Sequence, residues 1–254
     1  PSLEGEEMYS VNSPGFAGGD RTSIELPQVQ RDILKALKKA GKKVVFVNCS
    51  GSAVALVPEM ESCDAILQAW YPGQAGGLAV ADVLFGDFNP SGKLPVTFYK
   101  NTDQLPDFED YSMKNRTYRY MTEVPLFPFG YGLSYTTFDI SKGRLNKKTI
   151  SAGQGLNFKV NVKNTGKYDG AEVIQVYVRK VDDTEGPIKS LRAFRRVPLK
   201  AGETCVVSID LLPTTFEFFD PTTNTMRIMP GKYEIMYGNS SDIPSGNKLS
   251  VTLR

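Results

Sequence analysis

The chain has 254 residues, a formal net charge of +2 and a hydrophobic fraction of 41%. These values are typical of a globular protein of two domains, and the small charge gives no reason to expect nucleic acid or an anionic membrane as a partner. Histidine is absent, which excludes a serine–histidine or cysteine–histidine hydrolase within these residues and argues against a zinc or iron site. Acid–base chemistry would have to come from carboxylates, Lys, Tyr or Cys.

The three cysteines, Cys49, Cys63 and Cys205, are too few and too scattered for a disulfide framework or a zinc site. We expect them to be small apolar residues of the interior. No stretch approaches the roughly 18 apolar residues that a membrane span requires, so none is expected.

The N-terminal stretch PSLEGEEM carries three carboxylates, Glu4, Glu6 and Glu7. Charged residues at a terminus are usually solvated. Here, however, Gly-rich loop sequence follows, and then a well-signalled helix and strand. This arrangement suggests a chain that starts in the middle of a domain.

The first regular element predicted is a helix over residues 27–41. Pro27 is suited to its start and Gly41 to its end, apolar residues recur between them at helical spacing, and lysines fill the last turns. Residues 42–48 form an apolar run of the kind found in a parallel sheet that is covered on both faces.

A similar unit follows along the chain. The predicted elements are a short helix over 58–63, a strand over 64–72, a Gly-rich turn into a helix over 73–86, and a turn followed by a short strand over 87–100. We expect the apolar residues of the second helix, among them Leu78 and Leu84, to lie mostly on its packed side. The result is an α/β layer of at least three strands, whose expected first strand would precede Pro1, as in a fragment of a larger domain.

The sequence changes character at about Phe138. Alternating runs separated by Gly, Asn, Pro and Asp predict an antiparallel β-sandwich of about seven strands. We therefore predict two domains, residues 1–137 and 138–254. Arg192, Arg195 and Arg196 could form an anion-binding patch, but the outward side of a half-buried strand is the better interpretation.

Two segments contain residue types that suit ligand binding. The loop Gly73–Gly77 lacks both nucleotide-binding fingerprints, so we expect a tight turn beside a crevice and no nucleotide cofactor. Residues 114–121 interleave Arg116 and Arg119 with Tyr118 and Tyr120. They form either an amphipathic β-like stretch or a surface that hydrogen-bonds and stacks on a polyol.

Glycoside hydrolysis needs two carboxyl groups and no histidine. A Glu on a loop entering a crevice, its pKa raised by burial, is the type of general acid that LEGEE could supply. By itself, a cluster of Glu residues is more often solvated than catalytic.

Three stretches together resemble a known family: DAILQAWYPGQAGGLAVADVLFGDFNPSGKLPVTFYK (64–100), RTYRYM (116–121) and PLFPFGYGLSYTTF (125–138). They are similar to the second domain of family-three glycoside hydrolases, which include β-glucosidases and β-xylosidases. The remainder looks like the fibronectin type III-like domain that often follows it. The resemblance implies an α/β sandwich, with a parallel-rich sheet and helices on both faces, followed by an all-β fibronectin type III-like sandwich.

In this family a TIM-like barrel carries an Asp nucleophile and the α/β sandwich carries the acid/base Glu. The acid/base lies in an E-x-E-G-like pattern followed by DR and LP, which LEGEEM and GGDRTSIELP match. Glu6 aligns best with the acid/base, and Glu4 is the fallback. The choice is open because Glu7 stands where Gly is common and the loop from Tyr9 to Gly19 is long.

The resemblance further implies an exo-acting, retaining enzyme of the periplasm or the exterior that needs no cofactor or metal. Its substrates would be β-linked oligosaccharides or aryl glycosides with a terminal glucosyl or xylosyl residue, and Arg116 and Tyr118 are candidate substrate ligands. Its missing partner would be the N-terminal barrel, so we expect this chain alone to be inactive. The alternative is a non-catalytic carbohydrate-binding or structural module; an Ig-like adhesion protein would not explain WYPGQAGG.

Overall fold

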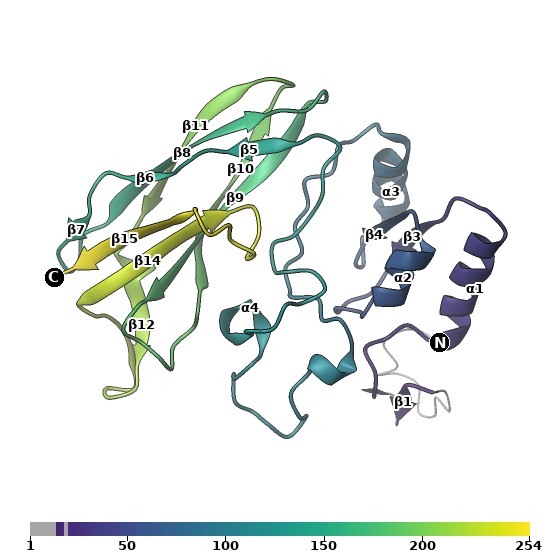
Figure 1. Cartoon of the computed structure of the whole chain (residues 1–254), viewed down its shortest axis with the longest axis horizontal. Coiled ribbons are helices and arrows are strands. Elements are labelled where there is room, and N and C mark those ends of the chain that lie inside the picture. The colour runs from purple at the N-terminus through teal and green to yellow at the C-terminus, as the bar shows by residue number, and fades with distance from the viewer. Residues whose placement is uncertain (1–13, 18–19) are drawn as a thin grey trace. The chain divides into compact units, whose positions relative to one another are not determined.

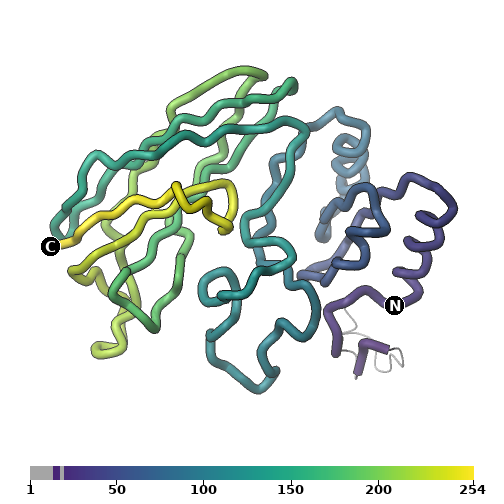
Figure 2. The backbone as a smooth tube through the Cα atoms, in the orientation of Figure 1, coloured from purple at the N-terminus to yellow at the C-terminus, as the bar shows by residue number. Residues whose placement is uncertain are grey.

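The computed structural model describes residues 14–17 and 20–254, shown in Figures 1 and 2. The chain divides into two compact units. The α/β unit contains the described residues up to Asp87 together with 96–112 and 123–127, and the sandwich unit contains 88–95, 113–122 and 128–254. Three short segments before residue 138 thus group with the sandwich. The family boundary between residues 137 and 138 stays a prediction, because units of contact and family domains need not coincide.

The α/β unit is built around a parallel strand pair. Its elements are β1 (Phe16–Ala17), β2 (Asp20–Arg21), α1 (Gln28–Lys39), β3 (Val45–Asn48), α2 (Val57–Ser62), β4 (Ala65–Gln68), α3 (Gly76–Phe85) and the 3₁₀ turn Thr102–Gln104. Strands β3 and β4 pair in parallel from Val45 opposite Ala65 to Asn48 opposite Gln68, and α2 lies between them in the chain. Parallel strands need such a crossover connection. The predicted helices and the first two predicted strands are confirmed.

Two expectations for this unit are wrong. No third strand forms over residues 87–100, where Phe98 makes only an isolated bridge to Phe127. Pro95, which cannot donate to a ladder, separates this bridge from Leu94, whose amide pairs with the carbonyl of Tyr131. The expected packed side of α3 is also wrong for two residues, because Leu78 is 67% exposed and Leu84 42% exposed, whereas Val80, Ala81 and Val83 are half-buried.

The sandwich unit confirms the predicted all-β domain (Figure 1). One sheet has the order β10-β9-β14-β15-β7, and the other has the order β11-β8-β5 with β6 also paired to β8. All pairs are antiparallel except β15 with β7. The bounds are β5 (Phe138–Ile140), β6 (Arg144–Leu145), β7 (Thr149–Ile150), β8 (Leu156–Asn164), β9 (Gly170–Lys180), β10 (Ser190–Leu199), β11 (Thr204–Leu211), β14 (Gly231–Gly238) and β15 (Lys248–Leu253). A hairpin of β12 (Glu217–Asp220) and β13 (Thr225–Ile228) follows the 3₁₀ turn Pro213–Phe216.

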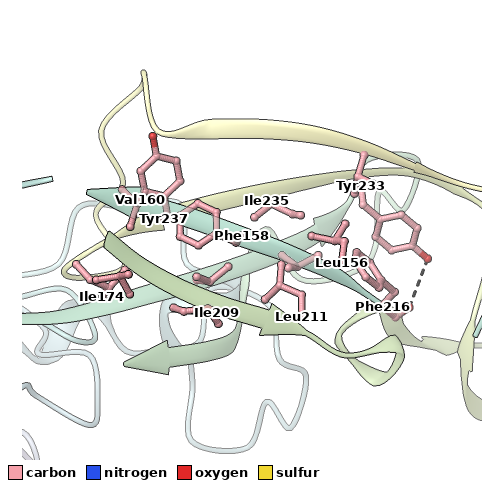
Figure 3. Close-up of a cluster of buried hydrophobic side chains, with 14 of the residues drawn as sticks. Leu156, Phe158, Val160, Ile174, Ile209, Leu211, Phe216, Tyr233, Ile235 and Tyr237 are labelled. Atoms are coloured by element: carbon pink, nitrogen blue, oxygen red, sulfur yellow. Dashed lines mark hydrogen bonds between the residues drawn. The ribbon is translucent and has the colours of Figure 1, made fainter. Parts of the chain in front are cut away.

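The core of the sandwich follows from alternation along its strands. In β8 every second residue from Leu156 is buried, as the period of two in a strand requires. Figure 3 shows side chains from both sheets meeting between them. The ring centroids of Phe158 and Tyr237 lie 5.0 Å apart, and the Tyr237 hydroxyl accepts a hydrogen bond from the amide of Gly143 at 2.6 Å. A Cβ at Gly143 would stand 2.6 Å from the Phe158 ring, so only glycine fits there.

The RTYRYM segment is not β-like. It forms the single helical turn α4 (Thr117–Tyr120), entered through Asn115 and Thr117, which both have a φ of 57°. Among the described helices of both units, none is long and apolar enough to cross a membrane.

Candidate functional site

A buried polar network lies where β3 and β4 end. The Nδ2 atom of Asn48 donates to Oε1 of Gln68 at 2.6 Å and to Oγ of Ser50 at 3.1 Å. The Nε2 atom of Gln68 donates in turn to Oγ of Ser50 at 3.2 Å. Asn48 and Gln68 are the last residues of their strands, and ligands of α/β proteins bind outside this carboxyl edge. Sequence reasoning missed these residues, although a polar residue closing each apolar run was visible.

The loop after β3 extends the network toward the DR pair. The Ser50 hydroxyl donates to the carbonyl of Ser52 at 2.9 Å, and Nη2 of Arg21 donates to the Ser52 hydroxyl. Arg21 belongs to the DR pair that the family resemblance places after the acid/base loop. Arg21 is therefore tied to the loop that follows β3 at the carboxyl edge of the strands.

The loop after β4 is a close-packed turn. Trp70 has a φ of 57°, which is uncommon for a residue other than glycine, and its ring meets Phe98 edge to face at 6.1 Å. A Cβ at Gly76 would lie 2.3 Å from Cγ of Pro72, so this position of the Gly-rich loop requires glycine for packing.

The carboxylate of Glu25 is held by several hydrogen bonds. Thr102 donates to it from its amide at 2.9 Å and from its hydroxyl at 2.5 Å, and Ser23 donates from its hydroxyl. Burial raises the pKa of Glu25, but the hydrogen bonds from Ser23 and Thr102 outweigh burial and lower this pKa to about 2. Glu25 is thus ionised at neutral pH and suits a structural role, not that of a proton donor.

The candidate acid/base residues, Glu6 and its fallback Glu4, lie outside the described residues. Their role stays a prediction. Among residues 14–17 and 20–254, no three His, Cys, Asp or Glu side chains lie together in a group that could hold a metal ion.

Of the two candidate substrate ligands, Tyr118 has several protein partners. Its ring stacks on Phe129 at 4.3 Å and meets Tyr177 edge to face at 5.7 Å. Its hydroxyl accepts a hydrogen bond from the amide of Leu191 at 3.1 Å. Arg116 is half-buried just before α4. Tyr118 therefore ties α4 to the sandwich, and substrate binding by these two residues stays a prediction.

Other residues of the stretches that carry the family resemblance also contact β9 of the sandwich unit. The Nζ atom of Lys93 lies 2.7 Å from Oε1 of Glu172 and donates to the carbonyl of Gly132 at 3.0 Å. The side chain of Gln175 donates to the carbonyl of Gly130 at 3.0 Å. The GKLP and PFGYG portions therefore have a shared structural role. Polar residues within the apolar run AEVIQVYVR were the available signal.

Comparison with known sequences identifies both parts of the chain. The sequence profile of the Glycosyl hydrolase family 3 C-terminal domain matches residues 2–135, more than half of the chain, and that of the Fibronectin type III-like domain matches residues 172–241. The chain belongs to glycosyl hydrolase family 3. The predicted family and fold class are confirmed.

Members of glycosyl hydrolase family 3 are similar along almost the entire chain. A xylan 1,4-beta-xylosidase of Xylanibacter ruminicola is 62% identical over 253 residues, which cover 100% of this chain and 29% of that protein. A periplasmic beta-glucosidase of Salmonella typhimurium is 41% identical over 244 residues, covering 90% of this chain and 32% of that protein. The chain thus spans about a third of the length of these relatives.

Solved structures of the family agree with the fold. A β-glucosidase of Erythrobacter marinus superposes with a TM-score of 0.82 at 35% identity, over 100% of this chain and 34% of that one. A β-glucosidase of Listeria innocua in complex with glucose gives a TM-score of 0.79 at 32% identity, over 94% and 35% of the two chains.

Proposed function

We propose that this chain is the part of an exo-acting, retaining β-glycosidase that supplies the general acid/base residue. The observation that carries the proposal is the family match over residues 2–135, because this range includes the LEGEE loop. The described residues support it by anchoring Arg21, on the C-terminal side of that loop, to the carboxyl edge of β3 and β4. Glu25, ionised under its hydrogen bonds, does not compete for the role of acid.

In the proposed mechanism Glu6 protonates the departing glycosidic oxygen while a carboxylate nucleophile attacks the anomeric carbon. Glu6 then removes a proton from the water that releases the sugar from the enzyme. Such a pair of carboxyl groups stands about 5–5.5 Å apart in retaining enzymes. The nucleophile would be an Asp of a barrel domain outside these 254 residues, so the chain alone should not turn over substrate.

A terminal β-D-xylosyl residue is the first substrate to test, with β-D-glucosyl as the second. The relative that is 62% identical is named as a xylosidase, whereas a relative named as a β-glucosidase is 41% identical. The Salmonella relative is named as periplasmic, which supports a periplasmic or secreted location here. Oligosaccharides and aryl glycosides are the expected substrate classes.

The test compares Glu6→Gln, Glu4→Gln and Glu7→Gln in the protein expressed from the complete reading frame. General acid catalysis contributes about 10²–10⁴-fold, so Glu6→Gln should lower kcat on a xylobiose-type substrate by that factor. The leaving group of a dinitrophenyl xyloside needs no proton. With this substrate only the second step, in which water releases the sugar from the enzyme, should be slowed. Azide, which needs no general base, should restore this step and yield the β-xylosyl azide.

The matched variants separate the possible outcomes. Normal activity of Glu6→Gln together with these defects in Glu4→Gln would move the role to Glu4. Normal activity in all three variants would remove the acid/base from this loop and contradict the proposal. If the complete protein binds xylo-oligosaccharides without cleaving any glycoside, the non-catalytic binding module is the correct alternative. Turnover by the pure 254-residue chain would contradict the need for an external nucleophile.

A further inference from the structure

Two arginine side chains of the sandwich unit lie near each other without an acidic partner. After burial, the positive charge of Arg119 is the next cause that lowers the pKa of Arg192. The ion pairs of the described residues involve other side chains and include neither arginine. Glu217, the acidic group that acts on Arg192, forms no ion pair with it, although its backbone carbonyl accepts a hydrogen bond from Nη2. Both arginines are half-buried, and charges withdrawn from water are normally paired.

Three polar atoms of the two arginines and of Ser190, which lies two residues before Arg192 on β10, lack hydrogen-bond partners in the protein. They are Nε of Arg119, Nε of Arg192 and Oγ of Ser190, all shielded from solvent. Nearly all buried polar atoms of folded proteins have a partner. Both Nε atoms can only donate, and the hydroxyl can donate as well. The group that would complement all three is therefore rich in acceptors.

The backbone presents Arg192 by means of a bulge. Along β10, Leu191 pairs with Tyr177 and Ala193 with Val176, so Arg192 is the extra residue that opposes none on β9. Bulges re-aim a side chain and are frequent beside functional sites. The strand that carries this bulge begins at Ser190.

The turn α4 is fastened to both sides of Ser190. The amide of Ile188 donates to the carbonyl of Arg119 at 2.8 Å, and the amide of Leu191 donates to the hydroxyl of Tyr118. One main-chain hydrogen bond and one bond from a main-chain amide to a side-chain hydroxyl thereby hold α4 against the start of β10.

Aromatic rings support both cations. The guanidinium carbon of Arg192 lies 4.7 Å from the ring centroid of Phe218, and that of Arg119 lies 5.6 Å from the centroid of Tyr120. An arginine that stacks on a ring still presents its N–H groups at the edge of the guanidinium plane, where carboxylate and phosphate are recognised.

We propose that Arg119, Ser190 and Arg192 form a binding site for a small oxyanion. Such a ligand would neutralise the repulsion between the two guanidinium groups and accept hydrogen bonds from all three unpartnered atoms. It has two possible sources, an inorganic anion such as phosphate or the carboxylate of an acidic sugar. This proposal does not depend on the catalytic one.

The experiment titrates the 254-residue chain by calorimetry with sodium phosphate and with sodium glucuronate. Sodium chloride at equal ionic strength is the control for charge screening, and glucose is the neutral counterpart of glucuronate. We expect saturable binding of at least one of the two anions and none of glucose. Preference for phosphate or for glucuronate identifies the source of the ligand.

Variants locate the site. A hydrogen bond to a charged group corresponds to about a tenfold change in affinity or more, so Arg192→Lys and Arg119→Lys should each weaken binding by about that factor. Ser190→Ala removes only a hydroxyl that has no protein partner; it should leave the fold intact and weaken binding as well. Arg195→Lys is the matched control, because Arg195 lies exposed on the same strand and donates to the carbonyl of Ser208. Equal binding by all four variants, or no saturable binding beyond the chloride control, would overturn the proposal.

Discussion

The two units bury their apolar side chains to very different extents. The sandwich has a continuous core in which Phe158, Ile174 and Tyr237 are fully buried. In the α/β unit no residue of α1 is buried, and the only buried residue of α3 is Gly76. On α1, Val29 is 65% exposed although it belongs to the apolar stripe that predicted the helix.

The difference separates two sources of stability. The sandwich strands alternate cleanly, and both sheets turn their apolar sides to one interior. The α/β unit relies more on polar contacts, such as the Asn48–Gln68 and Glu25–Thr102 hydrogen bonds. We therefore expect substitutions of core residues to cause the largest losses of stability in the sandwich. In the α/β unit the loss of hydrogen bonds should contribute more.

Phe158→Ala should produce the largest effect. Truncating a buried Phe costs about 3–5 kcal/mol through lost burial and a cavity, and Phe158 also contacts Tyr237. The matched change in α1, Val29→Ala, should alter the free energy of unfolding by less than about 0.5 kcal/mol, as surface substitutions do.

The measurement is urea unfolding followed by two probes. Trp70 is the one tryptophan of the chain and lies in the α/β unit, whereas circular dichroism of strands reports mainly on the sandwich. Phe158→Ala should shift the dichroism midpoint. Equal shifts for Phe158→Ala and Val29→Ala would refute the comparison of the two units.

Ion pairs provide a second contrast. Lys93 and Glu172 are nearly buried, with side-chain exposures of 12% and 7%, whereas Lys43 is 91% exposed in its pair with Asp64. Lys93→Met leaves the carboxylate of Glu172 buried without its cation, so we expect the free energy of unfolding to fall by about 3 kcal/mol. The hydrogen bond that Asn239 still donates to Glu172 limits this loss. Lys43→Met should cost about 0–1 kcal/mol. Comparable losses from both variants in thermal unfolding would contradict this contrast.

The sequence predicted the helices and strands better than the contacts that these elements make with distant segments. The alternation in LNFKVNVKN and the helical spacing in residues 28–39 both identify real elements, because each pattern follows from the geometry of one element alone. The exposure of Leu78 and the absence of a strand around Phe98 depend on which distant segments of the chain pack against these residues. The same holds for the candidate site, since the pairing of Asn48 with Gln68 depends on strand register. The bulge at Arg192 likewise leaves no mark in a single sequence.

Tyr237→Phe tests a single hydrogen bond within the sandwich core. The variant keeps the ring beside Phe158 but leaves the buried amide of Gly143 without its acceptor. An unsatisfied buried donor costs about 1–3 kcal/mol, so the loss should lie between those of Lys93→Met and Lys43→Met. A change of less than about 0.5 kcal/mol in urea unfolding, the size of a neutral surface substitution, would mean that this amide finds another partner.

Glu25→Gln should give a small effect, and one that depends on pH. The pKa of Glu25 is lowered from 4.5 to about 2 in the folded protein, so the unfolded chain takes up this proton first as the pH falls. The carboxylate therefore stabilises the α/β unit fully above pH 4.5, and its contribution is lost as the pH falls toward 2. Near neutral pH the variant should be less stable by about 1 kcal/mol, the value of one hydrogen bond to a charged group over a neutral one.

The decisive quantity for Glu25 is the difference in stability between the native protein and Glu25→Gln, followed by Trp70 fluorescence at several pH values. This difference should be constant from pH 7 to about 5 and should shrink below pH 4.5, where Glu25 begins to be protonated in the unfolded chain. Hydrogen bonds from the Val44 amide and from Lys43 lower the pKa of Asp64 to about 2 as well, but Asp64 is present in both proteins and cancels in the difference. A difference that stays constant down to pH 2.5 would mean that Glu25 is not held ionised by Ser23 and Thr102, and Glu25 would then become a candidate proton donor beside Glu6.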